Sequence, residues 1–406
     1  MKNFLHDKRI VVIGGCGHVG LPLGVRFALA GATTILVDID AEAVKTVNTG
    51  MFPFMERRGD EQLSTALERG LTATTSSDVC NTADVVVFAT ATTLDNRLDP
   101  QSERVEHVFN EYVYHLAPGT LAIMRSTLSP GTMDRLRLRS TEKGLDVRLA
   151  YCPERIAQGF ALEEIVSLPQ IVAAFDDETF DAAYRVFAAI APSIIRLTPL
   201  ETELAKLMHN AWRFMQFAIA NQFYMTADQH GVDFSRIYRA MCYKYPRAEG
   251  YKQSGFAAGP CLLKDTRQLA ACMEDGFGFG HAALLVNEGL ATFVVNKTAK
   301  ALGGTVKGKT VGLLGMAFKA NCDDTRDSLS YKVKADLEKR GARVMDNDPH
   351  VSGTQPLEKV LAVSDALILC VPHADYKSLK TEKPIVDAWF FLEPANIEIL
   401  PGTENI

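Results

Sequence analysis

The chain has 406 residues, of which 47% are hydrophobic and 23% are charged, and its formal net charge is −6. This composition is ordinary for a globular protein of two or three domains. The negative net charge argues against nucleic acid and anionic membranes as partners.

The eight cysteines are scattered along the chain, without a Cys-x-x-Cys pair or a histidine spaced to complete a zinc site. We therefore expect no metal, and a reducing, cytoplasmic location suits free thiols better than a disulfide framework does. The first fifteen residues lack the apolar core of a signal peptide. No window reaches the ~18 uncharged apolar residues of a membrane span.

The first chemical motif follows a short apolar strand at residues 9–13 and precedes a helical pattern at residues 21–30. Between them, Gly15, Gly17 and Gly20 fit the pattern G-x-G-x-x-G. The glycines permit a tight turn and let backbone N–H groups approach a pyrophosphate at the helix N-terminus. The segment, which includes His18 and Val19, therefore predicts a dinucleotide site.

A second strand, at residues 34–37, ends at Asp38, which lies 23 positions after Gly15. An acid at this distance is placed to accept hydrogen bonds from the adenosine ribose hydroxyls, and it would repel a 2′-phosphate. We therefore expect NAD rather than NADP.

Hydroxyl residues follow the next two predicted strands, at residues 84–89 and 120–124. Thr92 and Thr127 could touch the cofactor there, although threonines at strand ends are also common caps. Further along, Glu154 follows Pro153 in a loop at a strand end, where acids often act on ligands, although a solvated loop acid is the simpler interpretation.

Strands at residues 170–174 and 193–197 flank a helix at residues 177–190, and Pro199 marks a domain boundary. Residues 200–230 contain neither Pro nor Gly, which predicts one helix of ~45 Å. Such a helix is suited to bridge domains and to form a dimer contact. Lys206 and Asn210 fall on one face of it, so they are either paired or face a polar cavity, unless Lys206 reaches solvent.

The most unusual stretch is SGFAAGPCLLKDT, residues 254–266. Its glycines and proline exclude a helix interior and place Cys261 directly after a tight bend. Lys264 and Asp265 follow within one turn if a helix starts there, which is how a reactive cysteine is often presented. The opposing interpretation is a buried structural cysteine. Arg247 and Tyr251, just before this loop, could contact phosphates.

A linker at Gly303-Gly304 precedes a second alternation of strands and helices, with strands at residues 310–314, 343–346, 366–371 and 385–387. Lys319, just after the first of these, suits an anionic ligand. We therefore predict an α/β protein with two Rossmann-like, doubly wound domains, at residues 1–198 and 303–406. A central helical domain at residues 199–302 joins them and carries the long helix.

The chain resembles the UDP-glucose/GDP-mannose dehydrogenase family in three blocks that together cover nearly its whole length. The matching segments are GGCGHVGLPLG with Asp38 and STLSPGT, then LAKLMHNAWR and GPCLLKD, then GLLGMAFKANCDDTRDS and VPHADY. The resemblance implies oxidation of a sugar primary alcohol to a carboxylate with two NAD consumed.

The resemblance also implies roles for individual residues. Cys261 would be the nucleophile that forms a thiohemiacetal and a thioester. The side chains around the reacting carbon would be Lys206, Asn210, Asp265 and Glu154. Contacts to NAD would come from the glycine turn, Asp38, Thr92, Thr127, Lys264 and Arg326. Contacts to a nucleotide-diphosphate sugar would come from Glu154, Arg155, Lys206, Asn210, Tyr251, Gly255 and Lys319, and from Arg247 of a partner subunit in a homodimer.

The chain departs from the family at two places. Residues 90–93 read Thr-Ala-Thr-Thr where the family usually has a Val-Pro-Thr-Pro-like segment, and Ala257-Ala258 stand in a loop that is usually richer in glycine. The stretch Cys-Pro-Glu-Arg-Ile at residues 152–156 favours the N-acetylhexosamine branch, with UDP-N-acetylmannosamine as substrate, over UDP-glucose. Two further interpretations stay open: a single-step β-hydroxyacid dehydrogenase, and a non-catalytic protein that binds NAD or a nucleotide sugar.

Overall fold

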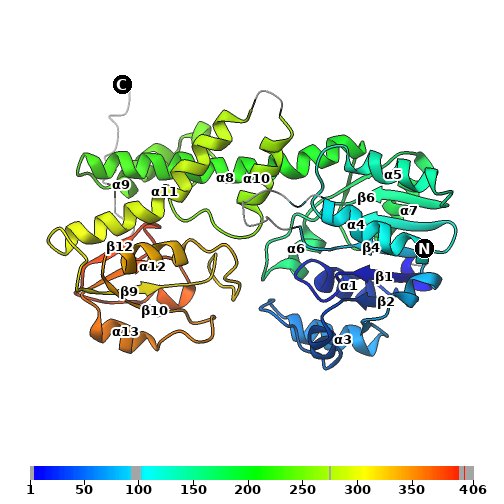
Figure 1. Cartoon of the computed structure of the whole chain (residues 1–406), viewed down its shortest axis with the longest axis horizontal. Helices are drawn as coiled ribbons and strands as arrows, with labels where there is room; N and C mark the ends of the chain where they lie inside the picture. The colour runs from blue at the N-terminus through cyan, green and yellow to red at the C-terminus, as the bar shows by residue number, and fades with distance from the viewer. Residues whose placement is uncertain (1–3, 93–100, 102, 274–275, 393–396, 398–406) are drawn as a thin grey trace, which may run out of the picture. The chain divides into compact units, whose positions relative to one another are not determined.

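The computed structural model describes residues 4–92, 101, 103–273, 276–392 and 397 (Figure 1). The chain divides into two compact units. The N-terminal unit comprises Met1–His209 and Arg267–Glu274, and the C-terminal unit comprises Asn210–Thr266 and Asp275–Ile406. The division into three domains stays a prediction.

The N-terminal unit contains an eight-stranded sheet in the order β3-β2-β1-β4-β5-β6-β7-β8. Its strands are β1 (Arg9–Ile13), β2 (Thr33–Val37), β3 (Thr72–Thr74), β4 (Val85–Phe88), β5 (Thr120–Met124), β6 (Val147–Tyr151), β7 (Gln170–Ala174) and β8 (Ile194–Leu197). All neighbouring pairs are parallel except β6 and β7. Strand order reverses beside β1, and that point in an open parallel sheet is where ligands bind.

Helices pack on both faces of this sheet (Figure 1). They are α1 (Gly20–Leu29), α2 (Ala41–Asn48), α3 (Gly59–Glu68), α4 (Glu103–Tyr112), α5 (Thr132–Glu142), α6 (Ala161–Ser167) and α7 (Asp177–Ala188). Along β1, Ile10 and Val12 join the core with α1 and α7, whereas Val11 and Ile13 join the core with α4 and α5. Successive side chains of a strand point to opposite faces, so one apolar run serves both cores.

The C-terminal unit contains helices and a parallel sheet in the order β10-β9-β11-β12. Its elements are α9 (Phe234–Cys242), α11 (Gly278–Ala301), β9 (Thr310–Leu314), α12 (Ser330–Lys339), β10 (Arg343–Asn347), α13 (Leu357–Val363), β11 (Ala366–Leu369) and β12 (Ile385–Asp387). Helix α11 is long and apolar enough to cross a membrane by composition alone, a test that core helices also pass. Eight of its residues are buried.

Two helices contain residues of both units. They are α8 (Pro199–Gln229) and α10 (Leu262–Ala271). The division falls between His209 and Asn210 in α8, and between Thr266 and Arg267 in α10.

The fold class predicted from the sequence is confirmed, including the long helix, which has 31 residues. Helix α12 begins at Ser330, and its N-cap residue Leu329 makes no side-chain cap hydrogen bond. Ser328 contributes there instead, because its Oγ accepts the Ser330 N–H.

Candidate active site

The glycine turn joins β1 to α1 and packs directly against β2. The N–H groups of Gly14 and Gly15 both donate to the carbonyl of Val37, at 2.9 and 3.0 Å. A Cβ atom on Gly15 would lie 2.7 Å from that of Leu36, and one on Gly20 would lie 2.2 Å from the Gly14 carbonyl oxygen. Both positions therefore require glycine for close packing.

Gly17 differs, because a Cβ atom there would meet only the Gly14 carbonyl oxygen, at 3.5 Å. Space on that side of the turn lets a ligand approach the backbone. The open side of the turn at Gly17 suits a pyrophosphate bound at the N-terminus of α1. Beside it, His18 stacks on Phe54 with ring centroids 3.9 Å apart, and Val19 is the N-cap residue of α1.

Asp38 follows β2, and its carboxylate is fixed beside the same turn. One oxygen accepts the Cys16 N–H at 3.0 Å, and the other accepts the Asp40 N–H at 3.1 Å. This geometry places an acceptor where the adenosine ribose of NAD is expected. Burial, with a further contribution from Asp38, raises the pKa of the Cys16 thiol to about 12. The Cys16 thiol is therefore less acidic than an ordinary cysteine thiol.

The carboxyl ends of β4 and β5 are joined by Ser126, whose hydroxyl donates to the Thr90 carbonyl at 2.7 Å. Thr127 follows in the chain, and both Thr127 and Thr92 are half-buried; Thr92 is the last residue of its described segment. Thr93, the last residue of the departure at residues 90–93, lies outside the described residues.

Lys206 and Glu154 form a part-buried ion pair in the N-terminal unit. Lys206 is only 3% exposed, and its Nζ lies 3.1 Å from Glu154 Oε1. The alternative in which Lys206 reaches solvent is therefore wrong. The other Glu154 oxygen accepts the Ile156 N–H at 2.8 Å, which leaves the carboxylate little freedom. Arg155 is directed elsewhere, because its guanidinium donates to the Pro169 carbonyl.

A buried arginine fixes the turn that carries Glu154. Arg125 donates from Nη1 to the carbonyls of Cys152 and Pro153, at 2.9 and 3.1 Å, and to Gln170 Oε1 at 2.6 Å. Burial lowers the pKa of this guanidinium, and nearby Glu154 opposes that shift. Arg125 was not among the residues predicted from the sequence, although its position directly after a buried strand was a usable signal.

In the C-terminal unit, Asp265 is fully buried and is held by two side chains. The Asn210 amide donates to one carboxylate oxygen at 2.5 Å, and the Lys264 ammonium lies 2.6 Å from the other. Asn210 and Lys264 are each 4% exposed. The structure thus brings together three of the predicted site residues and pairs Lys264 with Asp265. The contact of Lys264 with NAD, which the family resemblance implies, stays a prediction.

Cys261 precedes the first turn of α10, and its side chain is exposed. The Asp265 N–H donates to the Cys261 carbonyl at 2.9 Å, so the helix begins directly at the cysteine, as predicted. The interpretation as a buried structural cysteine is wrong. Arg326 lies within electrostatic reach: its pKa is raised chiefly by a hydrogen bond to Asp324, with a smaller contribution from Cys261.

The loop before Cys261 is shaped by two glycines with positive φ. Gly255 has φ +152°, and its N–H and carbonyl both bond the side chain of Asn221, at 2.8 and 3.0 Å. Gly259 has φ +97°, and a Cβ atom there would lie 2.4 Å from the Phe318 ring. Ala257, which belongs to the second departure from the family pattern, is buried.

Lys319 lies in the loop that follows β9, and a buried acid holds this loop. Asp348 accepts the N–H groups of Met316 and Ala317, at 2.6 and 2.9 Å, and contacts His373 Nε2 at 3.0 Å. Burial alone would raise the pKa of Asp348, but these hydrogen bonds outweigh it and lower the pKa to about 2. Asp348 and His373 follow β10 and β11, which flank β9.

The remaining two predicted residues lie on the segment between α9 and the cysteine loop. Tyr251 stacks on Tyr238, with ring centroids 5.5 Å apart. Arg247 is exposed, and its Nε donates to the Tyr245 hydroxyl at 2.7 Å.

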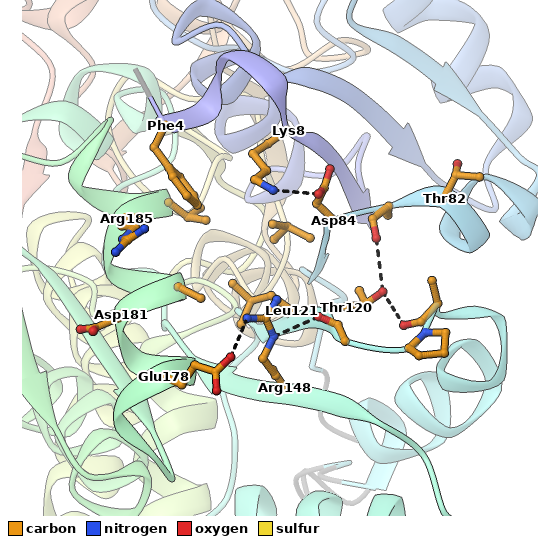
Figure 2. Close-up of a pocket in the computed structure, with 17 residues that line it drawn as sticks. Phe4, Lys8, Thr82, Asp84, Thr120, Leu121, Arg148, Glu178, Asp181 and Arg185 are labelled. Atoms are coloured by element: carbon orange, nitrogen blue, oxygen red, sulfur yellow. Dashed lines mark hydrogen bonds and ion pairs between the residues drawn. The ribbon is translucent and has the colours of Figure 1, made fainter. Parts of the chain in front are cut away.

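A separate cavity of about 600 Å³ lies at the opposite, amino edge of the N-terminal sheet (Figure 2). Its charged lining is largely self-paired, because Lys8 contacts Asp84 at 2.9 Å and Arg148 lies 3.7 Å from Glu178. It is remote in the topology from the glycine turn, which lies at the carboxyl edge.

The fold and these residues define an NAD-dependent dehydrogenase with two Rossmann-like sheets and a central helical region. Three models of one family match the chain in order. The NAD binding domain of the UDP-glucose/GDP-mannose dehydrogenase family matches residues 8–191, its central domain residues 200–288, and its UDP binding domain residues 312–394. The chain belongs to the UDP-glucose/GDP-mannose dehydrogenase family, the nucleotide-sugar dehydrogenases.

Relatives with similar sequences match the chain over nearly its full length. The chain is 29% identical over 387 residues to UDP-N-acetyl-D-mannosamine dehydrogenase of Pyrococcus horikoshii, covering 92% of this chain and 91% of that protein. It is 26% identical over 401 residues to NDP-N-acetyl-D-galactosaminuronic acid dehydrogenase of Ralstonia nicotianae, covering 93% and 94%.

Solved structures are also similar. The Pyrococcus horikoshii UDP-D-ManNAc dehydrogenase structure gives a TM-score of 0.88 at 27% identity, covering 96% of this chain and 97% of that one. A UDP-glucose dehydrogenase from Pyrobaculum islandicum gives 0.85 at 25% identity and covers 96% of each chain.

Proposed function

We propose that this enzyme oxidises the C6 alcohol of a UDP-N-acetylhexosamine, with UDP-N-acetylmannosamine favoured, to the uronic acid through covalent intermediates on Cys261. The observation that carries the proposal is an exposed cysteine at the start of α10, four residues before a buried carboxylate held by Asn210 and Lys264. The substrate choice is supported by the names of the relatives and by the UDP binding domain match. UDP-glucose is the second candidate, supported by the Pyrobaculum similarity.

The proposed chemistry has two oxidations and one hydrolysis. Loss of a hydride and a proton converts the C6 alcohol to an aldehyde, and the Cys261 thiol adds across its carbonyl to give a thiohemiacetal. Loss of a second hydride and a proton gives a thioester. Water then adds to the thioester carbonyl, and the carbon–sulfur bond breaks to release the acid and restore the thiol. The glycine turn and Asp38 would hold NAD, which would supply the hydride acceptor for both oxidations.

The side chains have separate tasks in this scheme. A thiol suits the nucleophile because it is reactive and leaves readily at neutral pH. Lys206 and Asn210, one turn apart on α8, donate to the oxygen that develops negative charge at each stage. Asp265 or Glu154 orients the hydrolytic water, since both carboxylates are already fixed by hydrogen bonds.

The test is the yield of NADH per sugar over UDP-N-acetylmannosamine, UDP-N-acetylgalactosamine, UDP-glucose and GDP-mannose. Two NADH per sugar and an acid product are expected for the preferred substrate. One NADH would favour a single-step β-hydroxyacid type of oxidation, and none with any sugar would sink the proposal.

Replacing the nucleophile separates the covalent scheme from simple oxidation. Cys261→Ser is expected to slow acid formation by about 100-fold or more, because an alkoxide is a poorer leaving group than a thiolate. Cys272→Ser is the matched control, since Cys272 is also exposed, and it should retain the wild-type rate. Full acid formation by Cys261→Ser would refute the role.

We also infer a homodimer formed through α8. Trp212 and Met208 are 55% and 52% exposed, and Phe223 and Ile219 are 44% and 39% exposed. Their spacings of four, seven and four place them on one helix face. Large apolar side chains gathered on one face are typical of a protein interface. Arg247, exposed in the same unit, would then contact the substrate of the partner subunit.

A further inference from the structure

We infer that Glu203 and Gln268 are positioning residues that bind the loop after β5 to α8 and α10 and thereby set Lys206 relative to the nicotinamide. The segment is residues 127–133, which include the first two residues of α5. It is called the nicotinamide loop below because the family resemblance implies that Thr127 lies beside the nicotinamide half of NAD. This inference rests on the proposed function. The hydrogen bonds of Glu203 and Gln268 to this segment all lie within the N-terminal unit.

The Glu203 carboxylate occupies the N-terminus of α5. Its oxygens accept the N–H groups of Gly131 and Met133, at 2.6 and 2.7 Å. The N-cap residue Gly131 has no side chain to cap the helix, so a carboxylate from α8 satisfies these donors instead. Glu203 is 0% exposed, and burial raises its pKa despite the two hydrogen bonds.

A buried carboxylate is a costly way to cap a helix, because an exposed serine or aspartate would serve the same end. Unlike a local cap, the Glu203 carboxylate links α8 to the start of α5. Glu203 lies three residues before Lys206 on α8, so the two side chains are neighbours along one helix. The position of the nicotinamide loop therefore fixes the turn of α8 that carries Lys206.

Gln268 makes a second link to the same loop. Its amide donates to the Ser129 hydroxyl at 2.8 Å, and Gln268 is 2% exposed. It follows Asp265 by three residues on α10. Two buried side chains from two helices, each about one turn from a proposed site residue, thus converge on one short loop. Hydride transfer is sensitive to this kind of positioning, since a misplacement of 1 Å can cost about 100-fold in rate.

The test uses Glu203→Gln in the full-length enzyme. The amide keeps the shape but offers a donor to one of the two backbone N–H groups, so one hydrogen bond is lost. Glu201→Gln is the matched control, because Glu201 lies on the same helix but is exposed and accepts hydrogen bonds from Thr198. Hydride transfer is followed as the first NADH formed in a single turnover, with unlabelled sugar and with sugar deuterated at C6.

We expect Glu203→Gln to slow the first hydride transfer by about 10- to 100-fold. The deuterium isotope effect on first NADH formation should then reach its full value, because hydride transfer limits the rate. NAD affinity should change by less than about twofold. A residue that only stabilises the fold would lower the amount of active enzyme but leave rate and isotope effect per site unchanged, and that outcome would overturn the inference. The Glu201→Gln control should behave as wild type.

Two further measurements keep the outcome decisive. Deuterium uptake by the peptide covering residues 127–134, in protein without NAD, should rise in Glu203→Gln and not in Glu201→Gln; unchanged uptake would also overturn the inference. If Glu203→Gln does not fold, Gln268→Met carries the kinetic test from α10, with the same expected slowing. A wild-type enzyme inactive with every sugar would defeat the proposed function alone, because the uptake measurement needs no substrate.

Discussion

At the scale of single residues, the site separates positions that a local pattern reveals from positions that only the fold reveals. Asp38 could be predicted because its distance from the glycine turn is fixed by one strand and one helix. Glu203 could not, because its partners Gly131 and Met133 lie 70 or more residues away and nothing near it in the sequence marks a cap. Asp348 and His373 follow two predicted strands, but their pairing depends on strand order.

Removing the Asp38 carboxylate tests the cofactor preference. Asp38→Ala should weaken NAD binding by about 10-fold, because hydrogen bonds to a charged acceptor are lost. It should also reduce the ratio of NAD affinity to NADP affinity, because the carboxylate that repels a 2′-phosphate is removed. Asp40→Ala is the control: Asp40 caps α2 through the Glu42 and Ala43 N–H groups, so its loss should cost about 1 kcal/mol of stability without changing the preference. Titrations of both variants with both cofactors measure this. An unchanged NAD to NADP ratio in Asp38→Ala would contradict the assignment.

At the scale of elements, apolar strands were easy to predict and polar helices were not. Strands β1 and β5 are continuous runs of buried side chains, and their predicted bounds agree with the structure. Helix α5 is strongly polar, so periodicity gave no signal for it. Strand β3 has three residues, too few for a pattern. The start of α10 was predictable because Gly259 and Pro260 exclude a helix before Cys261.

The cysteine loop offers a sharp test at this scale. Gly259 and Gly250 both have positive φ, but a Cβ atom on Gly250 would meet nothing within 4 Å, whereas one on Gly259 would overlap the Phe318 ring. Gly250→Ala should therefore cost about 1 kcal/mol from backbone strain alone. Gly259→Ala should cost about 2–4 kcal/mol, because overpacking is added to the strain. Urea unfolding of both variants measures the difference, and equal costs would show that Phe318 yields freely.

At the scale of the whole molecule, the α/β class, both sheets and the long helix followed from the order of apolar runs and breaks. The location and the assembly stay predictions, because neither composition nor one chain's fold determines them. The exposed face of α8 makes the assembly testable. Trp212→Glu places a charge in the centre of the proposed interface, and loss of such an aromatic anchor weakens association by about 2 kcal/mol or more, or roughly 30-fold.

Sedimentation of the wild type and Trp212→Glu at matched concentrations measures this shift. Leu138→Glu is the control, because Leu138 is 59% exposed on α5 in the N-terminal unit and should leave the assembly unchanged. A wild type that is monomeric throughout, or a Trp212→Glu variant that associates as strongly as the wild type, would contradict the inferred dimer.

The boundary between the two units cuts through α8 after His209. A fragment that stops there retains the ammonium of Lys206 and its partner Glu154, yet it lacks the amide of Asn210, the thiol and the carboxylate that follows it. The complementary fragment has the reverse deficiency. Exchange of segments between related genes at this joint would therefore divide one turn of α8 between two parents, and the proposed roles of Lys206 and Asn210 would require both side chains to come from one parent.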